Sequence, residues 1–150
     1  MQFSEDMKAL LSLFEKHRVR YVLVGGHAVN YYGYVRTTQD MNVLVYPSSA
    51  NATRLMGAIE DFGFAGAGIP RRLFEDEGGA VHLGVEPNRI DIHMSLVGAT
   101  NDEIFANAEV VQIDDLEVRI ISLEDLLRVK RGSKRPRDQA DADELSKIKV

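Results

Sequence analysis

Apolar residues recur along the chain at helical and at strand spacings, and together these spacings predict an α/β domain. The first pattern is an i, i+3, i+4, i+7 stripe near the N-terminus, which predicts an amphipathic helix that begins at about Ser4. The stripe consists of Met7, Leu10, Leu11 and Phe14. The β-prone run Tyr21–Val24 follows and stops at Gly25 and Gly26, as expected for a buried strand that enters a tight turn.

A short helix and a second strand are expected after the two glycines. Residues 27–32 can be helical, and residues 40–46 are again strand-like. Successive side chains of a strand point to opposite faces, so Asp40 and Asn42 share one face. A helix that starts after glycines presents free N–H groups and a positive dipole end, which suit a phosphate. We therefore expect Asp40 and Asn42 to point toward the group that the glycine corner holds.

Helical and loop patterns follow the second strand. Ser48 and Ser49 predict the start of a helix that stops at Gly63. Residues 64–79 are rich in glycine and charged residues, so we expect a mobile loop or lid beside the site.

Two hairpins and two helices are expected in the second half of the chain. Turn residues at 86–88 and at 114–115 each separate two short apolar runs, which predicts antiparallel pairs. The four runs are residues 80–85, 89–94, 110–113 and 116–120. Capping residues predict a helix from Ser122 to about residue 131 and another from Asp138 to about residue 148. These elements predict a mixed, mostly antiparallel sheet flanked by helices.

Composition narrows the classes of partner and environment. The chain has 150 residues, enough for a single domain over residues 1–150, and its formal charge of −5 argues against a surface that binds nucleic acid throughout. It contains no cysteine, so neither disulfides nor thiolate metal sites are available. The N-terminus is acidic, and no apolar run approaches the ~20 residues of a membrane span. We expect a soluble, cytoplasmic protein with no membrane partner.

Several motifs together resemble the nucleotidyltransferases of the polymerase β superfamily. The pair Gly25 and Gly26 at a strand end, followed by Asp40 on the next strand, is similar to their phosphate and metal motif. Three further motifs in the same order support the resemblance. They are Arg89-Ile90-Asp91-Ile92, the segment from Ile121 to Leu127 with Lys130, and Arg135-Pro136-Arg137-Asp138 followed by Asp141. The chain is most similar to the minimal, abortive-infection-type branch, which is often found in toxin–antitoxin systems.

The resemblance implies a nucleotidyltransferase fold and a site for a nucleoside triphosphate with Mg²⁺ or Mn²⁺. Gly25 and Gly26 would approach the phosphates, while Thr38 would bond a phosphate or cap its turn and Lys130 would face the triphosphate. Metal and catalysis would depend on Asp40, Asn42 and Asp91, with Asp91 as the candidate base. The acceptor of the nucleotidyl group would be a hydroxyl of RNA, of a protein or of a small molecule, and a toxin–antitoxin partner is a further expectation.

Asn42 departs from the pattern of the family, which has a second aspartate at this position. A neutral amide ligates a divalent cation more weakly than a carboxylate does, so the second metal would suffer most. The substitution is consistent with a single-metal variant, with an inert descendant or with an engineered change. The alternative function is therefore a weakened or inactive nucleotide-binding or protein-interaction module, similar to an antitoxin.

Several other side chains allow two interpretations. His93 shares a strand face with Asp91, so it is either a compensating ligand or a packed histidine. His27 either contacts a phosphate or fills the start of the helix. The nearby tyrosines either stack on a base or pack at the rim of the core, and they are Tyr31, Tyr32 and Tyr34.

Overall fold

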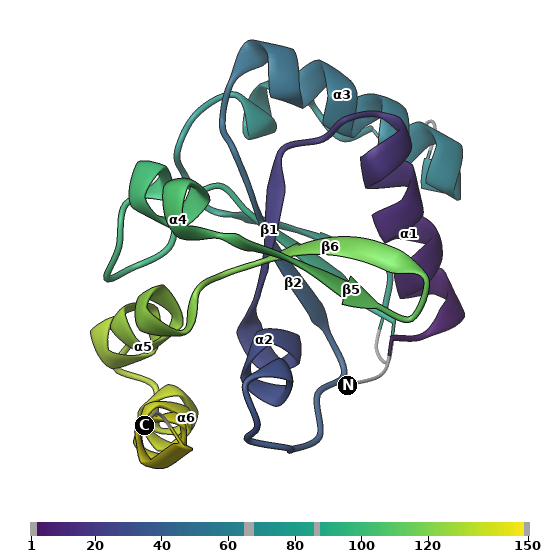
Figure 1. Cartoon of the computed structure of the whole chain (residues 1–150). Coiled ribbons are helices and arrows are strands. Elements are labelled where there is room, and N and C mark those ends of the chain that lie inside the picture. Colours follow the sequence, from purple (N-terminus) through teal and green to yellow (C-terminus); the bar gives the residue numbers. More distant parts are fainter. Residues whose placement is uncertain (1–2, 65–67, 86–87, 149–150) are drawn as a thin grey trace.

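A computed structural model describes residues 3–64, 68–85 and 88–148 of the chain. Figure 1 shows a central twisted sheet with helices around it. Within these ranges the strands are β1 (Tyr21–Val24), β2 (Met41–Val45), β3 (Ala80–Leu83), β4 (Ile90–His93), β5 (Glu109–Ile113) and β6 (Leu116–Ile120). The α-helices are α1 (Glu5–Lys16), α2 (Gly25–Tyr31), α3 (Ser49–Ile59), α4 (Asn101–Asn107), α5 (Leu123–Gly132) and α6 (Pro136–Ile148).

The sheet is mixed, with strand order β3-β4-β2-β1-β6-β5. The pairs β1–β2, β3–β4 and β5–β6 are antiparallel, whereas β1–β6 and β2–β4 are parallel. The two central strands, β1 and β2, carry the most buried side chains, and every residue of β1 is buried. The predicted mixed, mostly antiparallel sheet flanked by helices is confirmed.

The sequence signals for α1, α3 and α5 are also confirmed. Ser4, Ser48 and Ser122 are the N-caps, and each side chain accepts a hydrogen bond from the backbone N–H three residues later. The predicted apolar stripe of α1 is its buried face. Because α1 packs against α3 and β6, this stripe closes one side of the core.

Both predicted hairpins are present. The first pairs β3 with β4, and the second pairs β5 with β6 around Asp114, which adopts a left-handed φ of 55°. Part of the predicted first turn, residues 86–87, lies outside the described residues.

Three expectations about helices and loops need correction. Helix α6 begins at Pro136, so Asp138 lies within its first turn, and the Asp138 side chain accepts from Lys130 Nζ at 2.9 Å and from Ser133 Oγ at 2.6 Å. Helix α4 was not expected, and it begins with a reciprocal capping box between Thr100 and Glu103. Residues 65–67 of the expected lid lie outside the described residues, and beyond them a short 3₁₀ helix places Phe74 fully in the core.

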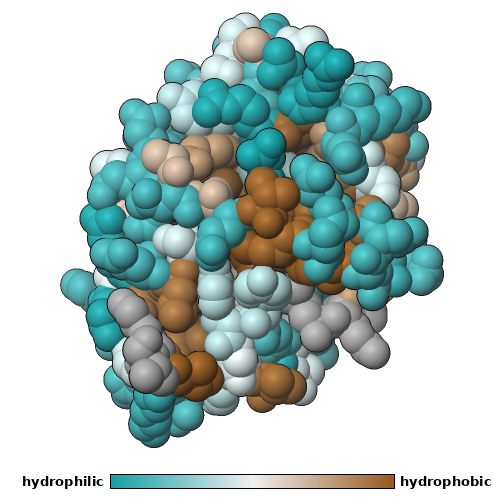
Figure 2. Space-filling view, viewed as in Figure 1, coloured by the Kyte–Doolittle hydropathy of each residue, from teal (hydrophilic) through white to brown (hydrophobic). Residues whose placement is uncertain are grey.

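The surface is mostly polar. Figure 2 shows charged and polar residues over most of the visible face, with apolar residues gathered in a few patches. None of the described helices combines the length and the apolar character needed to cross a bilayer.

Candidate active site

Strand register brings three of the predicted site residues together. Asn42 on β2 is opposite Val24, the last residue of β1, and it is also paired with Asp91 on β4. Asp40 directly precedes β2. The convergence expected of Asp40, Asn42 and Asp91 therefore occurs beside the corner where β1 enters α2.

The two glycines of this corner allow close packing of side chains from the same chain. Gly25 has a left-handed φ of +69°, and an added Cβ there would lie 2.8 Å from the Cβ of Asn42. A Cβ on Gly26 would collide with Thr38, whose Cβ would be 2.8 Å away. Both glycines belong to the first turn of α2, whereas the sequence predicted that the helix would begin after them. The pair is therefore required by the packing of Asn42 and Thr38, and a phosphate contact stays a prediction.

An arginine joins the two carboxylates. Arg89 Nη2 donates to Asp40 Oδ2 at 2.9 Å and to Asp91 Oδ2 at 3.1 Å, while Arg89 Nε donates to Asp91 Oδ1 at 2.9 Å. The Asp91 side chain is only 8% exposed, so these charge-assisted bonds compensate for its burial. This contact of Arg89 was not predicted from the sequence. The available signal was the spacing, because residues 89 and 91 are two apart and so lie on the same side of a strand.

Two histidines complete the contacts of the site. His82 on β3 is the cross-strand partner of Asp91, and its Nδ1 lies 2.6 Å from Asp91 Oδ1. His93 Nε2 lies 2.9 Å from Asn42 Oδ1. Burial lowers the pKa of His93, against the opposing charge of Asp91, so the neutral imidazole donates its Nε2 proton to the amide oxygen. His93 is thus a partner of Asn42, and the role of His82 was missed because nothing in the sequence shows the register of β3.

The donor set fits a divalent cation in kind, but its atoms already have partners within the protein. Two carboxylates and one amide oxygen are ligands of the hard type that Mg²⁺ prefers. Within the described ranges, no group of three or more His, Cys, Asp or Glu side chains is arranged to hold a metal. Arg89 lies between Asp40 and Asp91, where it satisfies the oxygens that a cation would use.

Lys130 takes part in a different network. Its Nζ lies 2.9 Å from Asp138 Oδ1 and 3.0 Å from Asp141 Oδ2, and the side chain is only 9% exposed. Arg36 donates to both oxygens of Asp141 at 2.8 Å. Burial alone would raise the pKa of Asp141, but the bonds from Arg36 and Lys130 outweigh it and hold the pKa below its usual value. The predicted triphosphate contact of Lys130 stays a prediction, since this ammonium joins α5 to α6 here.

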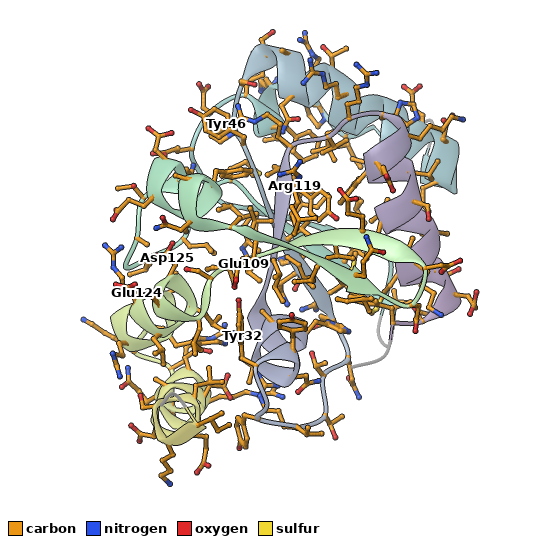
Figure 3. All side chains as sticks on the ribbon, in the orientation of Figure 1. Tyr32, Tyr46, Glu109, Arg119, Glu124 and Asp125 are labelled. Carbon is orange, nitrogen blue, oxygen red and sulfur yellow. The ribbon has the colours of Figure 1, made fainter. Side chains whose placement is uncertain are left out.

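His27 and Tyr32 are packing residues, whereas the stacking of a base on Tyr31, which is 40% exposed, or on Tyr34 stays a prediction. His27 is 2% exposed and stacks on Phe3 with ring centroids 5.1 Å apart. Burial lowers its pKa to about 4, although a hydrogen bond with the backbone of Asp40 opposes this shift. The Tyr32 side chain points toward Glu109 (Figure 3), and its hydroxyl donates a hydrogen bond to Glu109 Oε2 at 2.7 Å. Neither side chain is therefore available to a phosphate or a base in this arrangement.

Two cavities lie away from these residues. One of about 370 Å³ includes Tyr21 and Arg119 in its lining, and one of about 500 Å³ includes Tyr46 and Asn101. Tyr21 pairs with Val45, at the far end of β1 and β2 from Asn42. Because the carboxylates and the glycine corner are at the other end of these strands, we place the candidate site there and not in either cavity.

Comparison with known proteins bears on the family and the fold of the chain. A family model described as "Nucleotidyl transferase of unknown function (DUF2204)" matches residues 3–150. No curated protein sequence matches the chain. The structure is similar to lincomycin-bound LnuA, a lincosamide antibiotic adenylyltransferase, with a TM-score of 0.58 and 16% identity over 97% of this chain and 98% of that one. It is also similar to an antigenic nucleotidyltransferase-like protein from Paracoccidioides brasiliensis, with a TM-score of 0.56 and 10% identity over 95% and 74% of the two chains. These likenesses confirm the nucleotidyltransferase fold.

Proposed function

Because the chain belongs to the DUF2204 family of nucleotidyl transferases of unknown function, we propose that it transfers a nucleoside monophosphate from an NTP to a hydroxyl group. The observation that supports this proposal most is the convergence of Asp40, Asn42 and Asp91 beside Gly25. Oxygen ligands from two neighbouring strands, next to backbone that a side chain or phosphate can approach closely, are what a metal-bound triphosphate needs.

In this proposal Asp40, Asn42 and Asp91 are the residues that would hold Mg²⁺ or Mn²⁺. The cation would supply neutralisation of the charge that develops as pyrophosphate leaves. Gly25 approaches the phosphates, and Thr38, which packs on Gly26, offers its hydroxyl to one of them. Asp91 accepts the proton of the attacking hydroxyl. His82 Nδ1, 2.6 Å from Asp91 Oδ1, orients this carboxylate.

Only the similarity to LnuA indicates which nucleotide and which class of acceptor to test first. LnuA is named as an adenylyltransferase that binds an antibiotic, so ATP and a small-molecule hydroxyl are the first pair to test. Hydroxyls of RNA and of proteins are the other acceptor classes. The expected toxin–antitoxin partner and the expected cytoplasmic location stay predictions.

Thermal unfolding with each NTP tests the proposal without knowledge of the acceptor. A ligand at about 100 times its Kd stabilises the native state by about 2.7 kcal/mol, which corresponds to a rise in Tm of about 5–10 °C for a chain of this size. We expect such a rise with one NTP only when Mg²⁺ or Mn²⁺ is present. The rise should disappear in Asp40→Asn and persist in the matched exposed control Asp76→Asn. A rise in Tm that is absent, or that needs no metal, would favour the alternative function, a weakened or inactive nucleotide-binding or protein-interaction module.

A further inference from the structure

We propose that Arg89 is a resident cation of the site and that it excludes a divalent cation from Asp40 and Asp91 for as long as it occupies them. The proposed function supplies the reason for a metal here, and the inference rests on it only in that respect. Exclusion itself is a matter of geometry and charge.

The geometry leaves little room for both cations. Three N–H groups of one guanidinium reach Asp40 Oδ2, Asp91 Oδ1 and Asp91 Oδ2 at 2.9 to 3.1 Å. His82 Nδ1 is also within 2.6 Å of Asp91 Oδ1. Both oxygens of Asp91 therefore have donors, and a metal ion that took either one would displace a donated hydrogen bond.

The sheet determines where Arg89 lies, and the side chain alone is free to change. The backbone carbonyl of Arg89 accepts from Met41 N at 3.0 Å, which fixes residue 89 next to the start of β2. The Arg89 side chain is 34% exposed, whereas the Asp91 side chain is 8% exposed. Rotation about the long side chain is enough to move the guanidinium into solvent, and the carboxylates stay where the strands hold them.

Charge favours the arginine when no metal is present. Two carboxylates and one guanidinium give the group a formal charge of −1, and Asn42 adds nothing to it. An aspartate at position 42 would make the charge −2 and would attract a divalent cation more strongly. A divalent cation that shared the same oxygens with the guanidinium would face like-charge repulsion in a partly buried place. Asn42 and Arg89 therefore both lower the affinity of the site for a divalent cation. The site stays metal-free until a cation displaces the guanidinium.

Mn²⁺ binding to the purified full chain, without nucleotide, tests the inference by isothermal titration calorimetry. Arg89→Gln removes the charge and keeps a polar side chain, so Mn²⁺ should bind at least about tenfold more tightly than to the wild type. The matched control is Arg119→Gln, because Arg119 is exposed on β6, far from the carboxylates, and should leave the affinity unchanged. Adding Asp40→Asn to Arg89→Gln should abolish the gain.

Unchanged or weaker Mn²⁺ binding in Arg89→Gln would overturn the inference. If that variant does not fold, Arg89→Ala decides, because it also removes the guanidinium and its charge. A gain in Mn²⁺ affinity then supports exclusion by Arg89, and no gain overturns it.

The nucleotide experiment separates this inference from the proposed function. A variant that gains Mn²⁺ affinity but is not stabilised by any NTP would refute nucleotidyl transfer and leave the role of Arg89 standing. Stabilisation by an NTP, together with unchanged Mn²⁺ affinity in Arg89→Gln, would support nucleotidyl transfer and overturn the role of Arg89.

Discussion

Asn42 is packed between Gly25 and the imidazole of His93, so its exchange for aspartate keeps the shape, adds a negative charge and replaces the amide NH₂ donor by an acceptor oxygen. Asn42→Asp restores the acidic pair of the family pattern, and the neutral His93 can donate to a carboxylate as it does to the amide. We expect Asn42→Asp to raise metal-dependent pyrophosphate release by at least about tenfold, because one more carboxylate beside Asp40 and Asp91 is worth more than about 1.4 kcal/mol to a bound divalent cation. The release is measured with ATP and Mg²⁺.

Asn42→Asp combined with Asp40→Asn is the control, and it should show no increase over the wild type. An unchanged rate in the single variant would mean that position 42 does not contact the metal. It would also remove the only sequence feature that argued for a weakened enzyme.

His27 predicts a pH dependence of stability. Its pKa in the native state is about 4, because burial disfavours the charged ring, whereas an unfolded chain has a histidine pKa of about 6.5. As pH falls below about 6.5 the unfolded state takes up a proton that the native state refuses, so stability is lost on acidification. Between pH 7 and pH 5 we expect a loss on the order of 2 kcal/mol in the free energy of urea unfolding from this residue.

The comparison variant is His27→Gln, which does not titrate. It should be less stable than the wild type at pH 7, since it loses the stacking on Phe3, and its stability should depend less on pH over the same range. An identical pH slope in both proteins would mean that His27 titrates normally and is not buried as described.

At the scale of elements, α5 and α6 are joined by charge. Asp141 is 1% exposed and accepts from both Arg36 and Lys130, so it ties the segment after α2 to the two last helices. Asp141→Asn leaves two cations that are mostly buried with one carboxylate fewer, and removal of one partner of a buried pair is costly. We expect a loss of about 3 kcal/mol in urea unfolding. Asp143→Asn, an exposed change on the same helix, should cost less than about 0.5 kcal/mol. Equal effects of the two changes would contradict the structural role of this network.

Elements that carry their own local signals were predictable, and those that depend on distant partners were less so. Ser4, Ser48 and Ser122 cap helices through bonds within four residues, and apolar periodicity marked the helix faces. The sequence predicted Asp138 as a helix cap, but its carboxylate accepts hydrogen bonds from Lys130 and Ser133 instead. Helix α4 is short and offers only two buried side chains, so it has no apolar stripe to reveal it.

For the molecule as a whole, the site exists because the parallel pairing of β2 with β4 brings Asn42 beside Asp91. The sequence provided Asp40, Asn42 and Asp91 as candidates through the family resemblance and strand alternation. It did not provide Arg89 or His82 as their partners, since the register between strands far apart in the chain has no local signal. The sequence therefore predicted the residues that provide the oxygen atoms of the site. The structure shows which side chains, Arg89 and His82, contact those oxygens.

Transfer of label from α-labelled ATP is the most direct test of nucleotidyl transfer at Asp40, Asn42 and Asp91. Purified protein, Mg²⁺ and labelled ATP are incubated with a cell lysate, with RNA and with small hydroxyl compounds, and the labelled product is separated and counted. We expect metal-dependent labelling of one acceptor class by the wild type, and a loss of at least about a hundredfold in Asp40→Ala, which removes a carboxylate that would hold the cation. Equal labelling by Asp40→Ala and the wild type would show that the reaction does not take place at this site.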